Sequence, residues 1–173
     1  MVFPAISIIN FVALFYLGAK LSTLPLKNRS TKTFSYFFFA VAALALIEFL
    51  IYKSTSFREA IFWAYFASGW PIVLAFYLHF VITLTGLSKR MYTLITLVNY
   101  IAATIIAGLF ILYVQDYKPL YFVGGYALES PFLYSFPYIL IALWNILLLA
   151  VSFLFVIFGL RKKPKGSPQY EQS

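Results

Sequence analysis

Few residues of this chain can do chemistry, because only five of its 173 residues are acidic, one is histidine and none is cysteine. Five polar side chains nevertheless fall inside long apolar stretches: Asn10, Glu48, His79, Asn99 and Asn145. A polar group at hydrocarbon depth is costly, so each of them needs a hydrogen-bond partner or a function. The lack of cysteine excludes disulfides, thiol catalysis and cysteine-ligated metals.

His79 lies about one and a half turns from the end of its apolar stretch. The short turn at residues 85–91 brings Asn99 of the next stretch to the same depth, so we expect a His79–Asn99 hydrogen bond that joins two membrane helices. A proton-sensing role is the alternative, since imidazole titrates near physiological pH. One histidine without clustered carboxylates cannot complete a coordination shell, so we expect neither a metal nor a cofactor.

Glu48 has two interpretations. It lies about one turn inside the end of its apolar stretch, where it would pair with Lys53 or Arg58 at the membrane interface. Alternatively, it faces inward at the base of a cavity that takes a ligand. Asn145, which lies near mid-membrane, is expected to fix helix packing rather than to bind a ligand.

Pro71 lies inside an apolar stretch, in Ser68-Gly-Trp-Pro-Ile. Proline in a helix interior removes one backbone hydrogen bond and kinks the helix, and neighbouring helices must satisfy the freed carbonyl. The kink is either structural or a hinge for a signalling motion, and both interpretations stay open.

The composition identifies the elements that position these residues. Soluble domains are about 45–50% apolar and about 25% charged, whereas this chain is 63% apolar and 10% charged. This small number of charges cannot cover the surface of a soluble fold. The apolar surface must therefore face lipid. Five stretches approach or exceed the roughly 20 residues that span a bilayer. They are residues 4–21, 33–52, 60–84, 92–114 and 134–160. The prediction is an all-α transmembrane bundle over residues 1–160, followed by a basic and polar tail over 161–173.

The basic residues predict the orientation. Ten of the 13 follow the first, third and fifth stretches, and three lie on the opposite side. Since cytoplasmic loops carry an excess of Lys and Arg, we expect a multi-pass protein of the plasma membrane (the cell inner membrane) with its N-terminus outside and its C-terminus inside. The short basic runs fit anionic lipid headgroups and not nucleic acid.

The loop at residues 115–133 is rich in aromatic residues. Two short β-type runs flank Gly124-Gly125, which predicts a hairpin because glycine accepts the positive φ of tight hairpin turns. Tyr121, Phe122 and Tyr126 belong either to an interfacial aromatic belt or to a lid over a pocket for a small apolar or amphipathic ligand.

Catalytic motifs do not occur in the sequence. It contains no phosphate-binding Gly-rich loop with Lys-Ser/Thr, no Gly-x-Ser-x-Gly and no His-Glu-x-x-His. We therefore do not expect an enzyme.

A set of short motifs resembles a known family. The third apolar stretch carries Phe62-Trp63, Trp70-Pro71, Leu78-His79-Phe80-Val81 and Thr83-Leu-Thr85-Gly86. Asn10 with Gly18, Glu48-Phe-Leu-Ile-Tyr52, and Arg161-Lys-Lys with Gln169-Tyr-Glu-Gln172 accompany them. Together they resemble the histidine-kinase N-terminal seven-transmembrane region over nearly the whole chain.

The resemblance implies a sensory input module of signal transduction, as in two-component systems, with an outside N-terminus and a cytoplasmic output. This chain ends where the sixth helix of the family begins, so kinase activity does not carry over. We expect either a truncated product or a chain that works with a membrane protein partner or as a homo-oligomer. Two other classes stay open: a small transporter or channel subunit, and a scaffolding subunit of a membrane complex.

Overall fold

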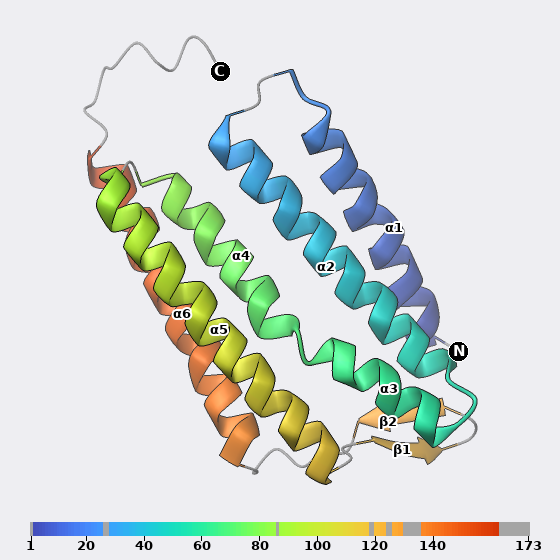
Figure 1. Cartoon of the computed structure of the whole chain (residues 1–173). Helices are drawn as coiled ribbons and strands as arrows, with labels where there is room; N and C mark the ends of the chain where they lie inside the picture. The colour runs from blue at the N-terminus through green and yellow to red at the C-terminus, as the bar shows by residue number, and fades with distance from the viewer. Residues whose placement is uncertain are drawn as a thin grey trace.

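The structure is a computed structural model, and it describes residues 2–25, 28–85, 87–117, 120–123, 126–129 and 136–162. Six helices and one hairpin make up the described part of the chain (Figure 1). The helices are α1 (Val2–Ser22), α2 (Arg29–Lys53), α3 (Phe57–Ala67), α4 (Trp70–Thr83), α5 (Lys89–Tyr117) and α6 (Phe136–Lys162). The strands are β1 (Leu120–Val123) and β2 (Tyr126–Glu129). The predicted helical bundle is confirmed.

Four segments are long and apolar enough to cross a membrane: Phe3–Ser22, Arg29–Lys53, Phe57–Thr83 and Lys89–Leu112. α6 follows with 27 residues and a described apolar stretch over Ala142–Ile157. Large apolar side chains stand outward on these helices, and Ile9 and Phe153 are 65% and 66% exposed. Exposure of such a surface is unfavourable in water and favourable in lipid. The chain is a multi-pass membrane protein.

The helices pack in a series, with α2 and α4 in its centre (Figure 1). α1 packs chiefly against α2, α2 also packs against α3 and α4, and α4 packs against α5 and α6. Aromatic pairs join α2 to α4: Phe34 stacks on Phe80 with ring centroids 4.3 Å apart, and Phe37 lies 5.7 Å from Tyr77. α2 and α4 therefore connect α1 and α3 with α5 and α6.

α1 approaches α2 closely at Gly18. The Ser35 hydroxyl donates to the Gly18 carbonyl at 2.8 Å. A Cβ atom at position 18 would lie 3.0 Å from the Phe39 ring, which is tighter than ordinary van der Waals contact. Small residues permit such close helix approach in membranes.

The two ends of the bundle differ in charge. Seven of the nine basic residues in the described ranges belong to the end where α1, α4 and α6 terminate (Figure 1). They are Lys20, Arg29, Lys32, Lys89, Arg90, Arg161 and Lys162. We call this the basic end. Lys53 and Arg58 lie at the opposite end, which we call the hairpin end. The basic end is the one we expect in the cytoplasm, and this orientation stays a prediction.

The third predicted span is a broken helix and not a kinked one. α3 ends at Ala67, Ser68 and Gly69 form a turn, and α4 starts at Trp70. Pro71 therefore lies in the first turn of α4, where helical backbone N–H groups have no intrahelical partner. The prediction of an interior proline that removes a hydrogen bond is wrong, because the break precedes the proline.

Capping residues set two helix starts. The Asn28 side chain accepts a hydrogen bond from Thr31 N at 2.7 Å, so α2 begins four residues earlier than predicted. The Ser56 hydroxyl accepts from Glu59 N at 3.2 Å, so α3 begins three residues before the predicted third stretch, which starts at residue 60.

The predicted hairpin is confirmed. β1 and β2 pair antiparallel with Val123 opposite Tyr126, so Gly124-Gly125 separates the strands. β2 lies against α2 and β1 against α3 at the hairpin end (Figure 1). The tail is predicted at residues 161–173, but Arg161 and Lys162 still belong to α6, and residues 163–173 lie outside the described residues.

Candidate functional site

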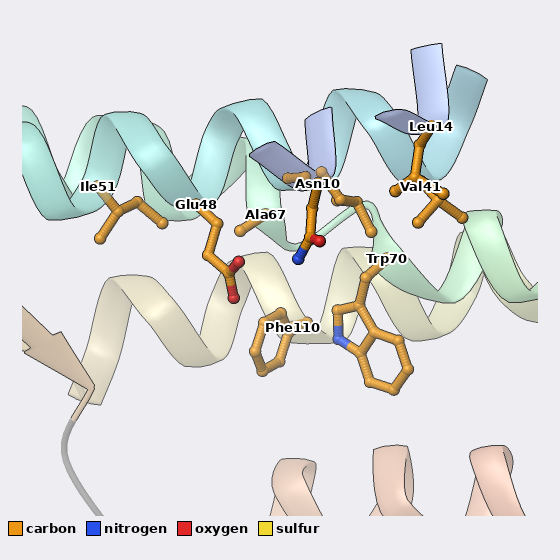
Figure 2. Close-up of a pocket in the computed structure, with 10 residues that line it drawn as sticks. Asn10, Leu14, Val41, Glu48, Ile51, Ala67, Trp70 and Phe110 are labelled. Atoms are coloured by element: carbon orange, nitrogen blue, oxygen red, sulfur yellow. The ribbon is translucent and has the colours of Figure 1, made fainter. Parts of the chain in front are cut away.

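A cavity of about 440 Å³ lies between α1, α2, the α3–α4 break and α5. Its apolar wall is formed by Leu14, Val41, Leu44, Ala45, Ile51, Ala67, Trp70 and Phe110. Two polar side chains, Asn10 of α1 and Glu48 of α2, extend into the same space opposite Trp70 and Phe110 (Figure 2). Apolar walls with few polar groups are typical of small-molecule sites.

The Glu48 carboxylate has one described hydrogen-bond partner. The buried Ser7 hydroxyl of α1 donates to Glu48 Oε2 at 3.0 Å. A carboxylate offers about four acceptor positions, so capacity remains on the side that faces the cavity. Asn10 lies three residues along α1 from Ser7 and so stands on the same helix face. Both polar side chains remain exposed.

Of the two interpretations of Glu48, the geometry fits the cavity and not the ion pair. Among the described residues, neither Lys53 nor Arg58 forms an ion pair with Glu48, whose hydrogen bond comes from Ser7. The pairing prediction is wrong because Glu48 turns toward α1. Glu59, by contrast, has a hydrogen-bond partner close to it in the sequence, since its carboxylate accepts from Thr55 N at 2.9 Å.

The lid interpretation of the hairpin stays a prediction. The backbone of Tyr121, Phe122 and Tyr126 is described, and it places the hairpin at the same end of the bundle as Glu48. The side chains of these three residues lie outside the described part of the structure.

A second polar group lies deeper toward the basic end, where His79 of α4 is held by two tyrosines of α5. His79 Nδ1 is hydrogen-bonded to the Tyr100 hydroxyl at 3.0 Å, and Nε2 is hydrogen-bonded to the Tyr92 hydroxyl. Neutral imidazole has one donor and one acceptor nitrogen, and a phenol hydroxyl can act as either. Both contacts are therefore satisfied whichever nitrogen carries the proton. We call Tyr92, His79 and Tyr100 the tyrosine–histidine cluster.

The predicted His79–Asn99 hydrogen bond is wrong. Asn99 Nδ2 instead donates to the Ala75 carbonyl at 2.9 Å, one turn before His79 on the same helix. Asn99 still joins α5 to α4, so its predicted role in helix association holds while its partner differs.

Buried polar atoms without a hydrogen-bond partner gather on α5 and α6 in the part of the chain that the structure describes. They are Thr96 Oγ1, Asn99 Oδ1, Trp144 Nε1, Asn145 Oδ1 and Ser152 Oγ. Asn145 therefore does not fix the packing of α6 through its side-chain oxygen. Apolar contacts do so, with Leu148 packed against Leu78 and Ile82 of α4.

Sequence reasoning missed Ser7, Tyr92, Tyr100 and Arg29. The two tyrosines stand eight residues apart, slightly over two helical turns, and so share one face of α5. A buried tyrosine hydroxyl needs a partner, and this requirement is the signal that could have indicated the pair. Nothing in the sequence singles out Ser7 from other small residues of α1.

Comparisons of the chain with protein-family models, with curated proteins and with solved structures gave no match. The resemblance to the histidine-kinase N-terminal seven-transmembrane region therefore stays a prediction.

Proposed function

We propose that this chain is a membrane-embedded sensory input module that binds a small amphipathic ligand in the Glu48 cavity. The observation that carries the proposal is a carboxylate at membrane depth that faces an open apolar cavity and accepts only one hydrogen bond among the described residues. Ionisable groups inside membrane spans generally mark ligand or ion sites. The resemblance to a sensor family supports the same class of function.

The chemistry of the lining selects the ligand class. No basic residue is among the described residues that line the cavity, so the Glu48 carboxylate can take a cationic group from a ligand. The Asn10 amide adds a donor and an acceptor, and the Trp70 and Phe110 rings favour a cation or an alkyl chain. A primary amine on an apolar chain satisfies all of these groups.

Two helices can carry the signal, because each runs from the Glu48 cavity toward the basic end of the bundle. α2 contributes Glu48 to the cavity and Arg29 to the basic end, and these residues stand about 28 Å apart along the helix axis. α4 contributes Trp70 to the cavity and His79 to the tyrosine–histidine cluster. A ligand that binds one arrangement of α2 and α4 better than another shifts their equilibrium. The α3–α4 break at Ser68–Gly69 is the natural hinge, in place of the proline kink.

The test is binding of octylammonium to the purified full chain in lipid nanodiscs, with octanol and octanoate as probes of matched tail. We expect saturable stabilisation by octylammonium and none by the other two. Glu48→Gln should weaken octylammonium binding about tenfold or more, since a hydrogen bond to a charged group contributes about 1.5–3 kcal/mol. Thermal unfolding at increasing probe concentration gives the midpoint.

Glu59→Gln is the matched control, because Glu59 is also a carboxylate at the hairpin end but does not line the cavity. It should keep the midpoint unchanged. Equal weakening by both variants, or equal stabilisation by octanol and octylammonium, would contradict the proposed site.

Transport is the second candidate, favoured by the break in the third span. Discontinuous helices with polar groups beside the break form substrate sites in many transporters. Octylammonium flux into vesicles that contain the chain, abolished by Glu48→Gln, would favour transport over sensing. Saturable binding without flux would favour the sensor.

A further inference from the structure

A second cavity, of about 330 Å³, lies at the basic end, between the N-terminal turns of α2 and α5 and the C-terminal turn of α4. Arg29, Lys89, Tyr92, Thr83, Ile82 and Leu87 line it. Two cations from different helices thus share one cavity, and none of these lining residues is acidic. We call it the basic cavity. It stands apart from the Glu48 cavity and takes no part in the ligand binding proposed there.

Arg29 is positioned by an aromatic contact. Its guanidinium carbon lies 3.8 Å from the centroid of the Tyr92 ring, a cation–π contact on a ring that is only 7% exposed. No carboxylate among the described residues forms an ion pair with Arg29 or Lys89. Both positive charges are therefore available to an anion, and the ring restricts where the guanidinium can go.

The setting defines the anion. The basic cavity lies at the end of four membrane-crossing segments, where lipid headgroups begin, and its other walls are the apolar side chains of Ile82 and Leu87. A guanidinium and an ammonium together match the oxygens of a phosphate group. Basic pockets between membrane helices bind phosphate-bearing headgroups by this chemistry.

We infer that the basic cavity binds the phosphate of an anionic ligand through Arg29 and Lys89. The site continues into the bundle, because the Tyr92 ring that holds Arg29 also carries the hydroxyl bonded to His79. A bound phosphate contacts the same Arg29 guanidinium that stacks on Tyr92. The anion therefore acts on the same α4–α5 contact that the tyrosine–histidine cluster forms.

The experiment measures thermal unfolding of the purified full chain in a neutral detergent against three probes. They are dihexanoyl phosphatidylglycerol, dihexanoyl phosphatidylcholine and inorganic phosphate. Phosphatidylglycerol should stabilise the wild-type chain with a saturable midpoint, and phosphatidylcholine should not. Arg29→Gln and Lys89→Gln should each raise that midpoint about fivefold, the loss expected for one cation near an anionic group.

Two neighbouring cations provide matched controls. Arg90 follows Lys89 on α5 and Lys32 lies three residues after Arg29 on α2, yet neither lines the basic cavity. Arg90→Gln and Lys32→Gln should leave the midpoint unchanged. Because the Lys89 side chain has no described partner, Lys89→Gln should fold even if Arg29→Gln does not.

The probes also separate the two sources of phosphate. Protection by inorganic phosphate with the same variant pattern would support the site and assign it to a soluble phosphate compound. Protection by phosphatidylglycerol alone would support the site and assign it to a lipid headgroup. Equal loss in all four variants would indicate a diffuse positive surface and would overturn the inference, as would equal protection by phosphatidylcholine.

Discussion

The Glu48 cavity and the tyrosine–histidine cluster both place an ionisable side chain inside a membrane span, but they treat it differently. Both ring nitrogens of His79 have a tyrosine hydroxyl as partner. The Glu48 carboxylate accepts one hydroxyl donor and otherwise faces an open cavity. Because incomplete pairing at membrane depth is costly, we propose that a ligand completes the pairing at Glu48, whereas complete pairing at His79 is typical of helix association.

A large loss of stability should follow a change in the tyrosine–histidine cluster. His79→Leu removes two hydrogen bonds and leaves two tyrosine hydroxyls without their partner, so we expect a loss of about 2 kcal/mol, since membrane hydrogen bonds contribute about 0.6–1.7 kcal/mol each. Glu48→Gln should change the free energy of unfolding by less than about 0.5 kcal/mol. Denaturant unfolding in mixed micelles measures both. Equal losses would erase the contrast between the two groups.

Gly18→Val should disturb the Glu48 cavity and not the tyrosine–histidine cluster. The added atoms meet the Phe39 ring, so α1 must move away from α2, at a cost of about 1–3 kcal/mol. Since α1 carries Asn10 and Leu14, octylammonium binding should weaken as well. Gly108→Val is the control, because a Cβ at Gly108 meets no atom within 4 Å. Unchanged probe binding in Gly18→Val would separate α1 from the cavity.

Asn99→Leu should cost about 0.6 kcal/mol or less. It removes the hydrogen bond to the Ala75 carbonyl, but it also removes Oδ1, a buried oxygen without a described partner. A loss above about 2 kcal/mol in the same unfolding assay would mean that Asn99 belongs to the paired group as fully as His79 does.

Pro71→Ala should have the smallest effect, a change in unfolding free energy of about 0.5 kcal/mol or less, because the first turn of a helix tolerates proline. An interior proline costs about 3 kcal/mol relative to alanine. Stabilisation near that value would mean that α3 and α4 tend to form one continuous helix. The α3–α4 connection between the Glu48 cavity and the tyrosine–histidine cluster would then be a strained kink.

Depth along the membrane could be predicted from the sequence, but rotation about the helix axis could not. The short turn at residues 85–91 correctly predicted that residues near 99 lie at the same depth as His79. Asn99 and Tyr100, however, differ by about 100° around the helix, and only packing decides which of them faces the imidazole. The same holds for Glu48, whose turn toward Ser7 depends on how α1 lies against α2.

Local chemistry explains the other successes and errors. The pair Gly124-Gly125 correctly predicted that β1 and β2 form a hairpin, because glycine is favoured between the strands of tight hairpins. Pro71 indicated a disturbance in the third span but not its place, because proline is harmless just after a break and costly inside a helix. The basic cavity joins residues far apart in sequence, and no local pattern links Arg29 to Lys89.

The most direct test of ligand binding at Glu48 uses Trp70, which lines the cavity. Trp63→Phe and Trp144→Phe leave Trp70 as the only tryptophan of the chain. Titration with 8-bromooctylammonium in nanodiscs should quench Trp70 fluorescence with a saturable midpoint, and Glu48→Gln in the same background should raise that midpoint about tenfold or more. Quenching that rises without saturation, equally in both proteins, would mean that the probe meets Trp70 only through the lipid, and it would contradict ligand binding at Glu48.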